Sequence, residues 1–174
     1  MNNINFNLIP DLITKRLVLR QLQLSDANEI FLLRTDDQIN AFIDRPRAIV
    51  ISDATAFINK IMTLQNNSEG LMWAITYRED PKLIGTIGIW NIVKERAQAE
   101  IGYELLPQYQ GKGIMLEALR SALKVAFESL KLETVVAHPR GDNLKSIRLL
   151  EKYGFINTHQ TDGAYLVYKL SSNS

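Results

Sequence analysis

The sequence predicts a mixed α/β fold, and three observations support this prediction. Strand-like runs come mostly in hairpin-linked groups, helical segments lie before, after and between them, and no linker, repeat or low-complexity stretch interrupts the 174 residues. This order favours a central, mostly antiparallel sheet of about six to seven strands flanked by about four helices. The length fits a single domain over residues 1–174.

The first part of the chain predicts a strand followed by two helices. In "RLVLR" the apolar Leu17 and Leu19 alternate with other residues, which is typical of a strand. Asp26 followed by Glu29 predicts a helix start, and the apolar residues after Ser52 fall mainly on one helical face. The elements expected here are a strand at 16–20, a helix at 26–34, a loop at 36–51 and a helix from 52 to the "NNSEG" stretch.

The rest of the chain predicts strands around two further helices. "LMWAITYR" and "LIGTIGIWNI" are strand-like, and the "EDPK" between them has the residues of a hairpin turn. Asp142 or Asn143 would cap the last helix, which Gly154 would end. The later elements expected are a strand in "AQAEIGYELL", a helix from the "QGKG" turn to about residue 130, a strand in "ETVVAHP", a helix in "DNLKSIRLLEKYG" and a closing hairpin around Asp162-Gly163.

Composition excludes several functions. Lys plus Arg number 20 against 19 for Asp plus Glu, so no basic excess indicates nucleic-acid binding. The chain has no cysteine and only two histidines, His138 and His159, without metal-ligand spacing, so neither a thiolate nucleophile nor a metal site is expected. No signal peptide and no apolar run of about 18 residues is visible, so we expect a cytoplasmic protein that does not span a membrane.

A glycine-rich turn, "YQGKGIMLEA", leads directly into a predicted helix. A P-loop would need glycine where Leu106 stands, and a dinucleotide fingerprint would need glycine where Leu116 stands, so both motifs fail. Gly111 and Gly113 would let the backbone approach a ligand closely, the helix start would favour an anion, and Lys112 would add positive charge. These features suit a pyrophosphate, although a glycine turn without a ligand is an equal reading of this stretch alone.

Three segments carry a family resemblance over nearly the whole chain. "TKRLVLRQLQLSDANEIF", "AEIGYELLPQYQGKGIMLEAL" and "DNLKSIRLLEKYGF" occur in order and at suitable spacing. In these segments the chain resembles the GNAT acetyltransferases, in particular the branch of RimJ/RimL-like protein N-terminal acetyltransferases. Gln110, Gly113 and Met115 occupy the fixed positions of the family's pyrophosphate signature, although Met115 replaces its usual Gly or Ala. Because Met115 keeps its backbone N–H, we expect a modified fit of the loop.

The resemblance implies a GNAT fold and a binding site for acetyl-CoA, the acetyl donor. It implies that pantetheine lies in a gap beside one strand, and that a backbone N–H of this strand polarises the thioester carbonyl. It also implies that Asn143 contacts pantetheine and that Ser146 serves the leaving sulfur, because Leu150 replaces the acid tyrosine of many family members. The implied cofactor-binding residues are Tyr103, Glu104, Leu105, Gln110, Gly111, Lys112, Gly113, Ile114, Met115, Asn143 and Ser146.

Direct transfer to an amine also requires a base. An alkyl ammonium with a pKa of about 10 is almost wholly protonated at neutral pH. Glu100 stands where several family members place the base, and period-two alternation puts Glu104 on the same strand face. Two carboxylates on one face could raise each other's pKa, which would strengthen the base. Glu100 is therefore the predicted base, and Glu104 is the second candidate.

The resemblance implies an N-acetyltransferase that acts on a primary amine, first of all a protein N-terminal α-amine. A small-molecule amine, such as a polyamine, an amino acid or an aminoglycoside, and a non-catalytic acyl-CoA-binding module are the alternatives. A homodimer is also compatible with the family. Arg16 and Arg20 are predicted to point outward, and His138 to be structural. Residues considered for a substrate wall are Phe42, Ile43, Trp90 and Tyr153.

Overall fold

The computed structural model describes residues 5–172, and these contain one mixed sheet of eight strands. The strand order is β1-β2-β3-β4-β5-β6-β8-β7, and every neighbouring pair is antiparallel except β5 and β6, which are parallel. The strands are Leu12–Ile13 (β1), Leu17–Gln21 (β2), Leu71–Tyr77 (β3), Asp80–Val93 (β4), Gln98–Leu105 (β5), Thr134–Ala137 (β6), Ile156–Asp162 (β7) and Tyr165–Ser171 (β8).

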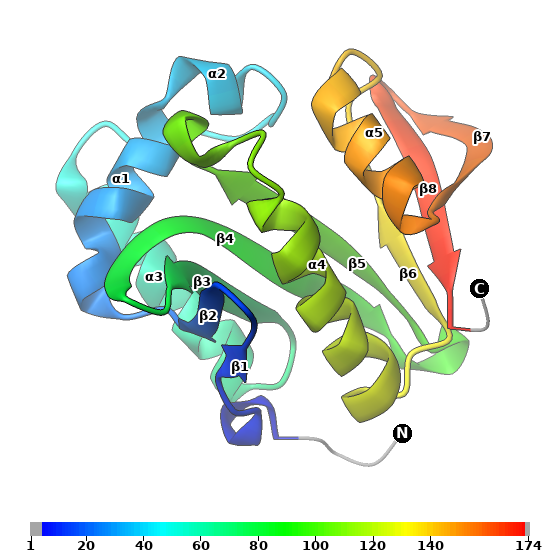
Figure 1. Cartoon of the computed structure of the whole chain (residues 1–174), viewed down its shortest axis with the longest axis horizontal. Helices are drawn as coiled ribbons and strands as arrows, with labels where there is room; N and C mark the ends of the chain where they lie inside the picture. Colours follow the sequence, from blue (N-terminus) through cyan, green and yellow to red (C-terminus); the bar gives the residue numbers. More distant parts are fainter. Residues whose placement is uncertain (1–4, 173–174) are drawn as a thin grey trace.

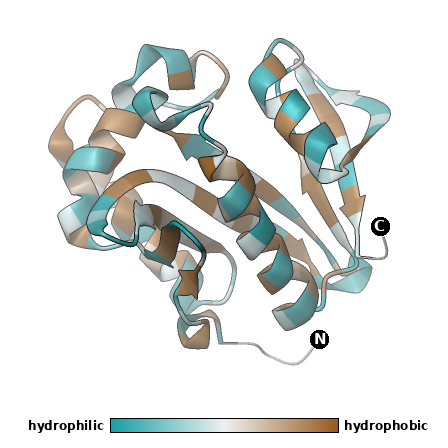
Figure 2. Cartoon of the chain, in the orientation of Figure 1, coloured by the Kyte–Doolittle hydropathy of each residue, from teal (hydrophilic) through white to brown (hydrophobic). Residues whose placement is uncertain are grey.

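Helices cover both faces of this sheet (Figure 1). The α-helices are Ala27–Thr35 (α1), Asp37–Asn40 (α2), Ile51–Asn66 (α3), Ile114–Lys124 (α4) and Leu144–Tyr153 (α5), and a π-helical turn at Val125–Ser129 extends α4. The helix α4 crosses in front of the sheet, whereas α3 lies behind it. In Figure 2 the sides of α4 and α5 that face away from the sheet are mostly hydrophilic, as expected for helices that each cover the sheet with one side.

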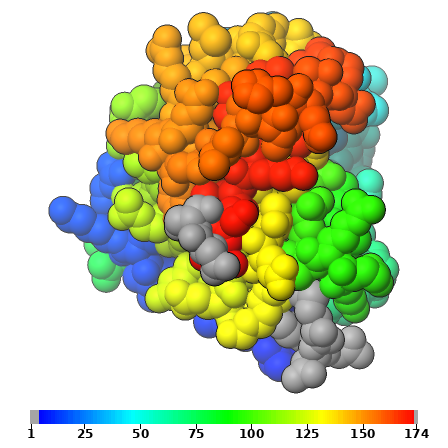
Figure 3. All heavy atoms as spheres, turned by 90° about the vertical axis from the view of Figure 1, so that its right-hand side faces the viewer, coloured from blue at the N-terminus to red at the C-terminus, as the bar shows by residue number. Residues whose placement is uncertain are grey.

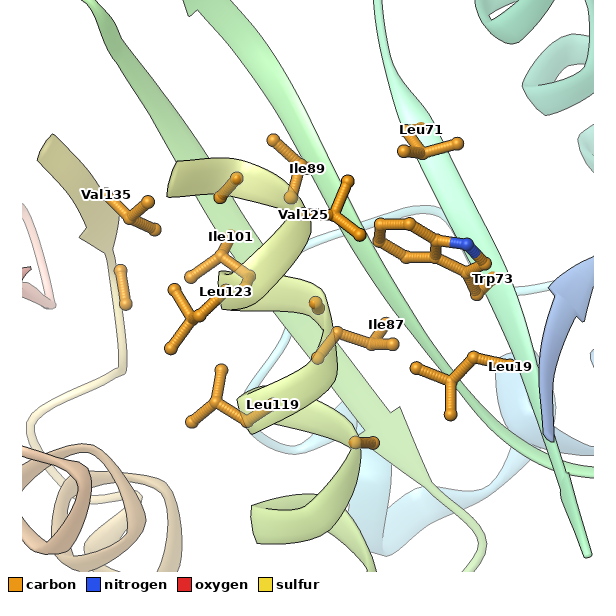
Figure 4. Close-up of a cluster of buried hydrophobic side chains, with 14 of the residues drawn as sticks. Leu19, Leu71, Trp73, Ile87, Ile89, Ile101, Leu119, Leu123, Val125 and Val135 are labelled. Carbon is orange, nitrogen blue, oxygen red and sulfur yellow. The ribbon is translucent and has the colours of Figure 1, made fainter. Parts of the chain in front are cut away.

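Two hydrophobic clusters share the sheet, one on each face. The larger cluster joins α4 to the central strands: Leu119 and Leu123 pack towards Ile87 and Ile101 (Figure 4). The second cluster joins α1 and α3 to the opposite face and includes Ile30, Ile58 and Ala74. Since all seven of these side chains are buried, the central strands are apolar on both faces, and their polar residues stand out as candidates for function.

The predicted strands and helices are present with small shifts in their ends, and the stretch 36–51, expected as a loop, contains one helical turn, α2. The capping of α5 by Asn143 and its end at Gly154 agree with the sequence, because the Asn143 side chain accepts a hydrogen bond from the Ser146 N–H and Gly154 has a left-handed φ of 105°. The short β1 strand had no visible sequence signal. The first and last residues of the predicted 1–174 domain lie outside the described residues.

Asp26 has a different role from the predicted one. Its carboxylate makes no cap bond at the start of α1; it accepts hydrogen bonds from the Gln23 N–H and from both terminal nitrogens of Arg20. Arg20 is therefore a mostly buried partner of Asp26, with 14% of its side chain exposed, and the prediction that it points outward was wrong. The alternation in "RLVLR" shows only which side chains share a face of the strand. It could not reveal that the Asp26 carboxylate lies beside the strand and pairs with Arg20.

Candidate active site

The sheet splits between β5 and β6. These strands pair only through Gln98–Thr134, Ala99–Val135 and Glu100–Val136, after which they diverge. They lie together at the lower right of Figure 1 and separate towards the top, where α4 and α5 begin on either side of the opening. Beyond Glu100 no strand of the described residues pairs with the β6-facing edge of β5, so its backbone groups are free to pair with an extended ligand.

The glycine turn shapes the start of α4 at this opening. Gly111 and Gly113 have left-handed φ angles of 73° and 72°, and Gly113 is the N-cap residue of α4 without a side-chain cap. Within residues 5–172 the backbone N–H groups from 111 to 116 make no hydrogen bond. A Cβ on Gly111 would meet nothing within 4 Å. Unpaired N–H groups at a helix start form an anion site, so this turn fits a pyrophosphate.

Positive side chains surround the turn, and one of them was missed by the sequence analysis. Arg16 donates from Nη1 to the Lys112 carbonyl at 2.9 Å and from Nε to the Glu117 carboxylate at 2.7 Å. Burial raises the pKa of Glu117, but hydrogen bonds from Thr14 and Arg16 outweigh burial, and its pKa is lowered overall. Arg16 therefore braces the turn from β2's side, and the prediction that it merely points outward was incomplete.

Gln110 and Met115 support the turn in different ways. The Gln110 side chain donates to the Leu105 carbonyl at 2.9 Å, and its oxygen accepts from Lys145 Nζ at 3.2 Å. Gln110 thus connects the end of β5, the turn and α5. Met115, which departs from the family pattern, packs its side chain against the larger hydrophobic cluster. Its side chain points into the protein, and its N–H remains among the unpaired groups at the helix start.

A tyrosine and a serine meet on the α4 side of the split. The hydroxyl of Tyr103 on β5 and Oγ of Ser146 on α5 lie 2.9 Å apart. Burial raises the pKa of Tyr103 to about 12, and the hydrogen bond with Ser146 opposes this effect. Tyr103 therefore keeps its proton at neutral pH and can donate it. The sequence indicated only the backbone of Tyr103, because its contact with Ser146 joins residues far apart in the chain.

The opposite face of the split carries a different set of groups. Glu100 on β5 and His138, just after β6, have Oε2 and Nδ1 3.7 Å apart, and each side chain is 32% exposed. Trp90 of β4 lies on the same face, since a Cβ on Gly102 would come within 2.3 Å of its ring. A carboxylate, an imidazole and an aromatic ring therefore meet where the sheet divides.

Glu104 is engaged elsewhere, so it does not act as a partner for Glu100. Its Oε2 accepts from Arg45 Nη2 at 2.6 Å and its Oε1 from the Thr86 hydroxyl at 3.4 Å, with 7% of the side chain exposed. Glu104 lies four positions along the strand from Glu100, a distance of about 13 Å. The expected like-charge pair of carboxylates is therefore not formed.

The loop between α2 and α3 is held over this face at two points. Arg45 donates to Asn40 Oδ1 at 2.9 Å and to the Leu33 carbonyl at 3.2 Å, in addition to Glu104. On the other side of the split, the Asp44 N–H donates to the hydroxyl of Tyr165 on β8 at 3.0 Å. The loop therefore bridges the two halves of the sheet, where it can contact an acceptor.

The hairpin of β7 and β8 follows β6 at the edge of the sheet. Figure 3 shows β7 and β8, in orange and red, beside the segment that leads into β6, in yellow.

Among the described residues, no helix combines the length and apolarity needed to cross a membrane, and no three acidic or histidine side chains are grouped as metal ligands.

A sheet split beside a glycine-led helix start defines a class of transferase that uses acyl-coenzyme A, and comparison with known proteins gives the family. A model described as an acetyltransferase (GNAT) domain matches residues 16–156. The chain belongs to the GNAT family of acetyl-CoA-dependent N-acetyltransferases. The uncharacterized N-acetyltransferase YoaA of Bacillus subtilis is 33% identical over 148 residues, which are 85% of this chain and 84% of the relative.

Solved structures show the same fold. The ribosomal-protein-S5-alanine acetyltransferase from Vibrio fischeri superposes with a TM-score of 0.81 at 19% identity, covering 95% of this chain and 98% of that one. The microcin C7 self-immunity acetyltransferase MccE, solved with acetyl-CoA and AMP, superposes with a TM-score of 0.78 at 26% identity, covering 91% and 93%. The predicted GNAT fold and acetyl-CoA as the donor are thus confirmed.

The glycine turn gives a first prediction. Gly113→Val should weaken acetyl-CoA binding at least about tenfold, because a β-branched side chain blocks the approach of phosphate to the backbone. Isothermal titration calorimetry with acetyl-CoA measures this effect. Gly163→Val is the matched control: Gly163 also has a positive φ, of 58°, but lies in the turn between β7 and β8. Equal affinity of the Gly113→Val variant and the wild type would contradict the assignment of the turn.

Proposed function

We propose that this protein acetylates the N-terminal α-amine of a protein, with a ribosomal protein as the first candidate. The observation that carries the proposal is the two-sided split, with Tyr103 and Ser146 on one face and Glu100 and Trp90 on the other. Donor and acceptor can then enter from opposite faces and meet in the gap. The fold of the Vibrio fischeri ribosomal-protein acetyltransferase supports the choice of acceptor. A ribosomal substrate would place the reaction in the cytoplasm.

The donor side is assigned to the turn, to the free edge of β5 and to α5. The N–H groups of residues 111–116 hold the pyrophosphate, with Lys112 beside them, while backbone groups of Tyr103, Glu104 and Leu105 pair with pantetheine. When bound, acetyl-CoA supplies an activated acetyl group and a thiolate leaving group. An N–H of the β5 edge stabilises the charge that develops on the acetyl oxygen.

Ser146 is assigned to the leaving sulfur. Its hydroxyl lies at the split and is bonded to Tyr103, so it is held by the protein and does not simply face solvent. Ser146 can donate its proton to the sulfur while accepting one from Tyr103. The amide of Asn143 caps α5 through its oxygen, which leaves its NH₂ group to contact pantetheine.

Glu100 is assigned as the basic group on the acceptor side. Its carboxylate is partly exposed on the face where the loop bridged by Arg45 and Asp44 would position the acceptor. A primary ammonium must lose a proton before its nitrogen can attack the acetyl carbon, and a nearby base increases the rate of this step. Trp90 provides an aromatic wall for the acceptor.

A small-molecule amine is the second candidate acceptor. The structure of MccE contains AMP together with acetyl-CoA, so a chain of this fold binds a small molecule in addition to the donor. A thiol-release assay with acetyl-CoA distinguishes the candidates, using peptides with free N-termini, polyamines, amino acids and aminoglycosides. Turnover confined to peptides supports the proposal, turnover confined to small amines replaces it with the second candidate, and binding without any turnover indicates a non-catalytic module.

Ser146 gives a second prediction. Ser146→Ala should lower kcat at least about tenfold while KM for acetyl-CoA changes much less, because the contact with sulfur strengthens as the thiolate leaves. Steady-state kinetics with saturating acceptor measures both constants. Ser121→Ala on α4 is a matched control, since Ser121 lies outside the split and makes no side-chain hydrogen bond within residues 5–172. An unchanged kcat in Ser146→Ala would remove Ser146 from the mechanism.

A further inference from the structure

The register of β6 against β5 places His138 on the acceptor face of the sheet. Val136 of β6 pairs with Glu100 of β5, so these two side chains share a face. His138 is two residues beyond Val136 and returns to that face. The next residue of β5 on this face is Gly102, which has no side chain and is covered by Trp90. The imidazole therefore meets the Glu100 carboxylate, with Nδ1 3.7 Å from Oε2.

A carboxylate alone is a weak base for an ammonium ion. The ordinary pKa of a glutamate is about 4.3, and one way to strengthen such a base is a second carboxylate nearby. Glu104 cannot provide this effect, because it is paired with Arg45 and lies four positions further along the strand. An imidazole has an ordinary pKa of about 6.5, which is matched to proton transfer near neutral pH.

We propose that His138 is the group that receives the amine proton and that Glu100 acts through it. This inference rests on the proposed function and refines the role of Glu100. The neutral ring carries its proton on Nδ1, facing the carboxylate, and Nε2 presents a lone pair to the acceptor. Nε2 takes one proton from the ammonium group of the acceptor, which frees the nitrogen lone pair to attack the acetyl carbon, and the Glu100 carboxylate stabilises the resulting imidazolium. The second proton, which the nitrogen loses once the carbon–nitrogen bond has formed, balances the one that Ser146 gives to the leaving sulfur. Since His138 is 32% exposed, water can then remove the proton.

The charged groups around His138 are compatible with its role as the proton acceptor. From β8, Lys169 pairs with Val136 and shares its face. Arg140 is bonded to Asp142 at 2.9 Å, so this nearby cation is already neutralised. Asp44 gives only its backbone N–H to the Tyr165 hydroxyl. The hydrogen bond with Asp142 and the negative charge of the Asp44 carboxylate raise the pKa of Arg140. Among the described residues, Glu100 is thus the acidic residue within ion-pair distance of the His138 imidazole. The 3.7 Å distance can shorten when an acceptor fills the site.

A matched pair of variants tests the inference. Asparagine keeps an NH₂ group near the position of Nδ1–H but has no basic nitrogen, so His138→Asn should retain the contact with Glu100. It should lose on the order of 10²-fold or more in kcat, with KM for acetyl-CoA within about threefold of the wild type. His159→Asn is the control, because His159 is exposed on β7 and its left-handed backbone suits asparagine. A purely structural role of His138 would predict full kcat in a folded His138→Asn protein.

Chemical rescue separates a base from a packing residue. His138→Ala leaves space beside Glu100, and added imidazole should restore part of kcat in proportion to the neutral form of the additive. The same additive should not change the rate of the wild type or of His159→Asn. Failure of imidazole to rescue, together with normal kcat in His138→Asn, would overturn the inference.

Nitrogen-15 NMR gives a readout that does not depend on turnover. The chain has two histidines, so the His138 signals can be assigned with the His159→Asn variant. At about pH 9 the neutral ring should be protonated on Nδ1 in the wild type and should shift towards Nε2–H in Glu100→Ala. An unchanged tautomer would contradict the contact. If His138→Asn is fully active while Glu100→Gln is impaired, Glu100 takes the proton directly; if the wild type acetylates no amine, the proposed function itself fails.

Discussion

Replacing Glu100 by glutamine should lower kcat about 10²–10⁴-fold at neutral pH, the usual contribution of a general base. Glutamine keeps the size and much of the hydrogen-bonding reach of the side chain but has no negative charge. The loss is expected whether the carboxylate removes the proton itself or does so through His138. Acetyl-CoA affinity should remain near that of the wild type, because the donor-side groups Tyr103 and Ser146 lie on the opposite face of the sheet.

The pH dependence makes this prediction specific. As pH rises towards the ordinary pKa of an alkyl amine, about 10, more acceptor arrives deprotonated and needs no base. The difference between the wild type and Glu100→Gln should therefore shrink with increasing pH. Initial rates across this range, at saturating acetyl-CoA, measure the effect. Glu95→Gln, in the exposed connection before β5, is the matched control. A pH-independent loss would mean that Glu100 positions the acceptor only.

The parts of the site that were predicted from the sequence are local. The turn at Gly111 and Gly113 has positive φ angles that glycine adopts without strain, and its spacing before a helix is visible in the chain itself. The cap at Asn143 likewise acts within three residues. Such signals depend on neighbouring residues, so a single sequence contains them in full.

The missed parts depend on contacts between distant residues. Arg16 meets Glu117, Tyr103 meets Ser146, and Arg45 meets Glu104. Each pair joins elements that come together only after the sheet has formed, and no spacing in the chain indicates them. The same reason explains why Glu104 was expected to act with Glu100: alternation placed both on one face correctly, but it could not show that an arginine from a remote loop neutralises one of them.

Arg45 and Glu104 give the largest expected effect on stability. Glu104→Leu should lower the free energy of unfolding by about 3–5 kcal/mol, because it leaves the largely buried Arg45 cation without its carboxylate. The Thr86 hydroxyl would lose its partner as well. Urea denaturation followed by circular dichroism measures this change, and the midpoint of thermal unfolding should fall by roughly 6–20 °C for a chain of this size.

A second substitution shows whether the charge causes the loss. In the double variant Arg45→Met, Glu104→Leu no buried charge remains unpaired, so most of the lost stability should return. The acceptor loop would still lack its anchor on β5, so the double variant should fold well yet keep a raised KM for the amine. Stability unchanged in Glu104→Leu alone would mean that Asn40 and the Leu33 carbonyl satisfy Arg45 without Glu104. A normal KM in the double variant would mean that the contact between Asp44 and Tyr165 is sufficient to hold the loop over the site.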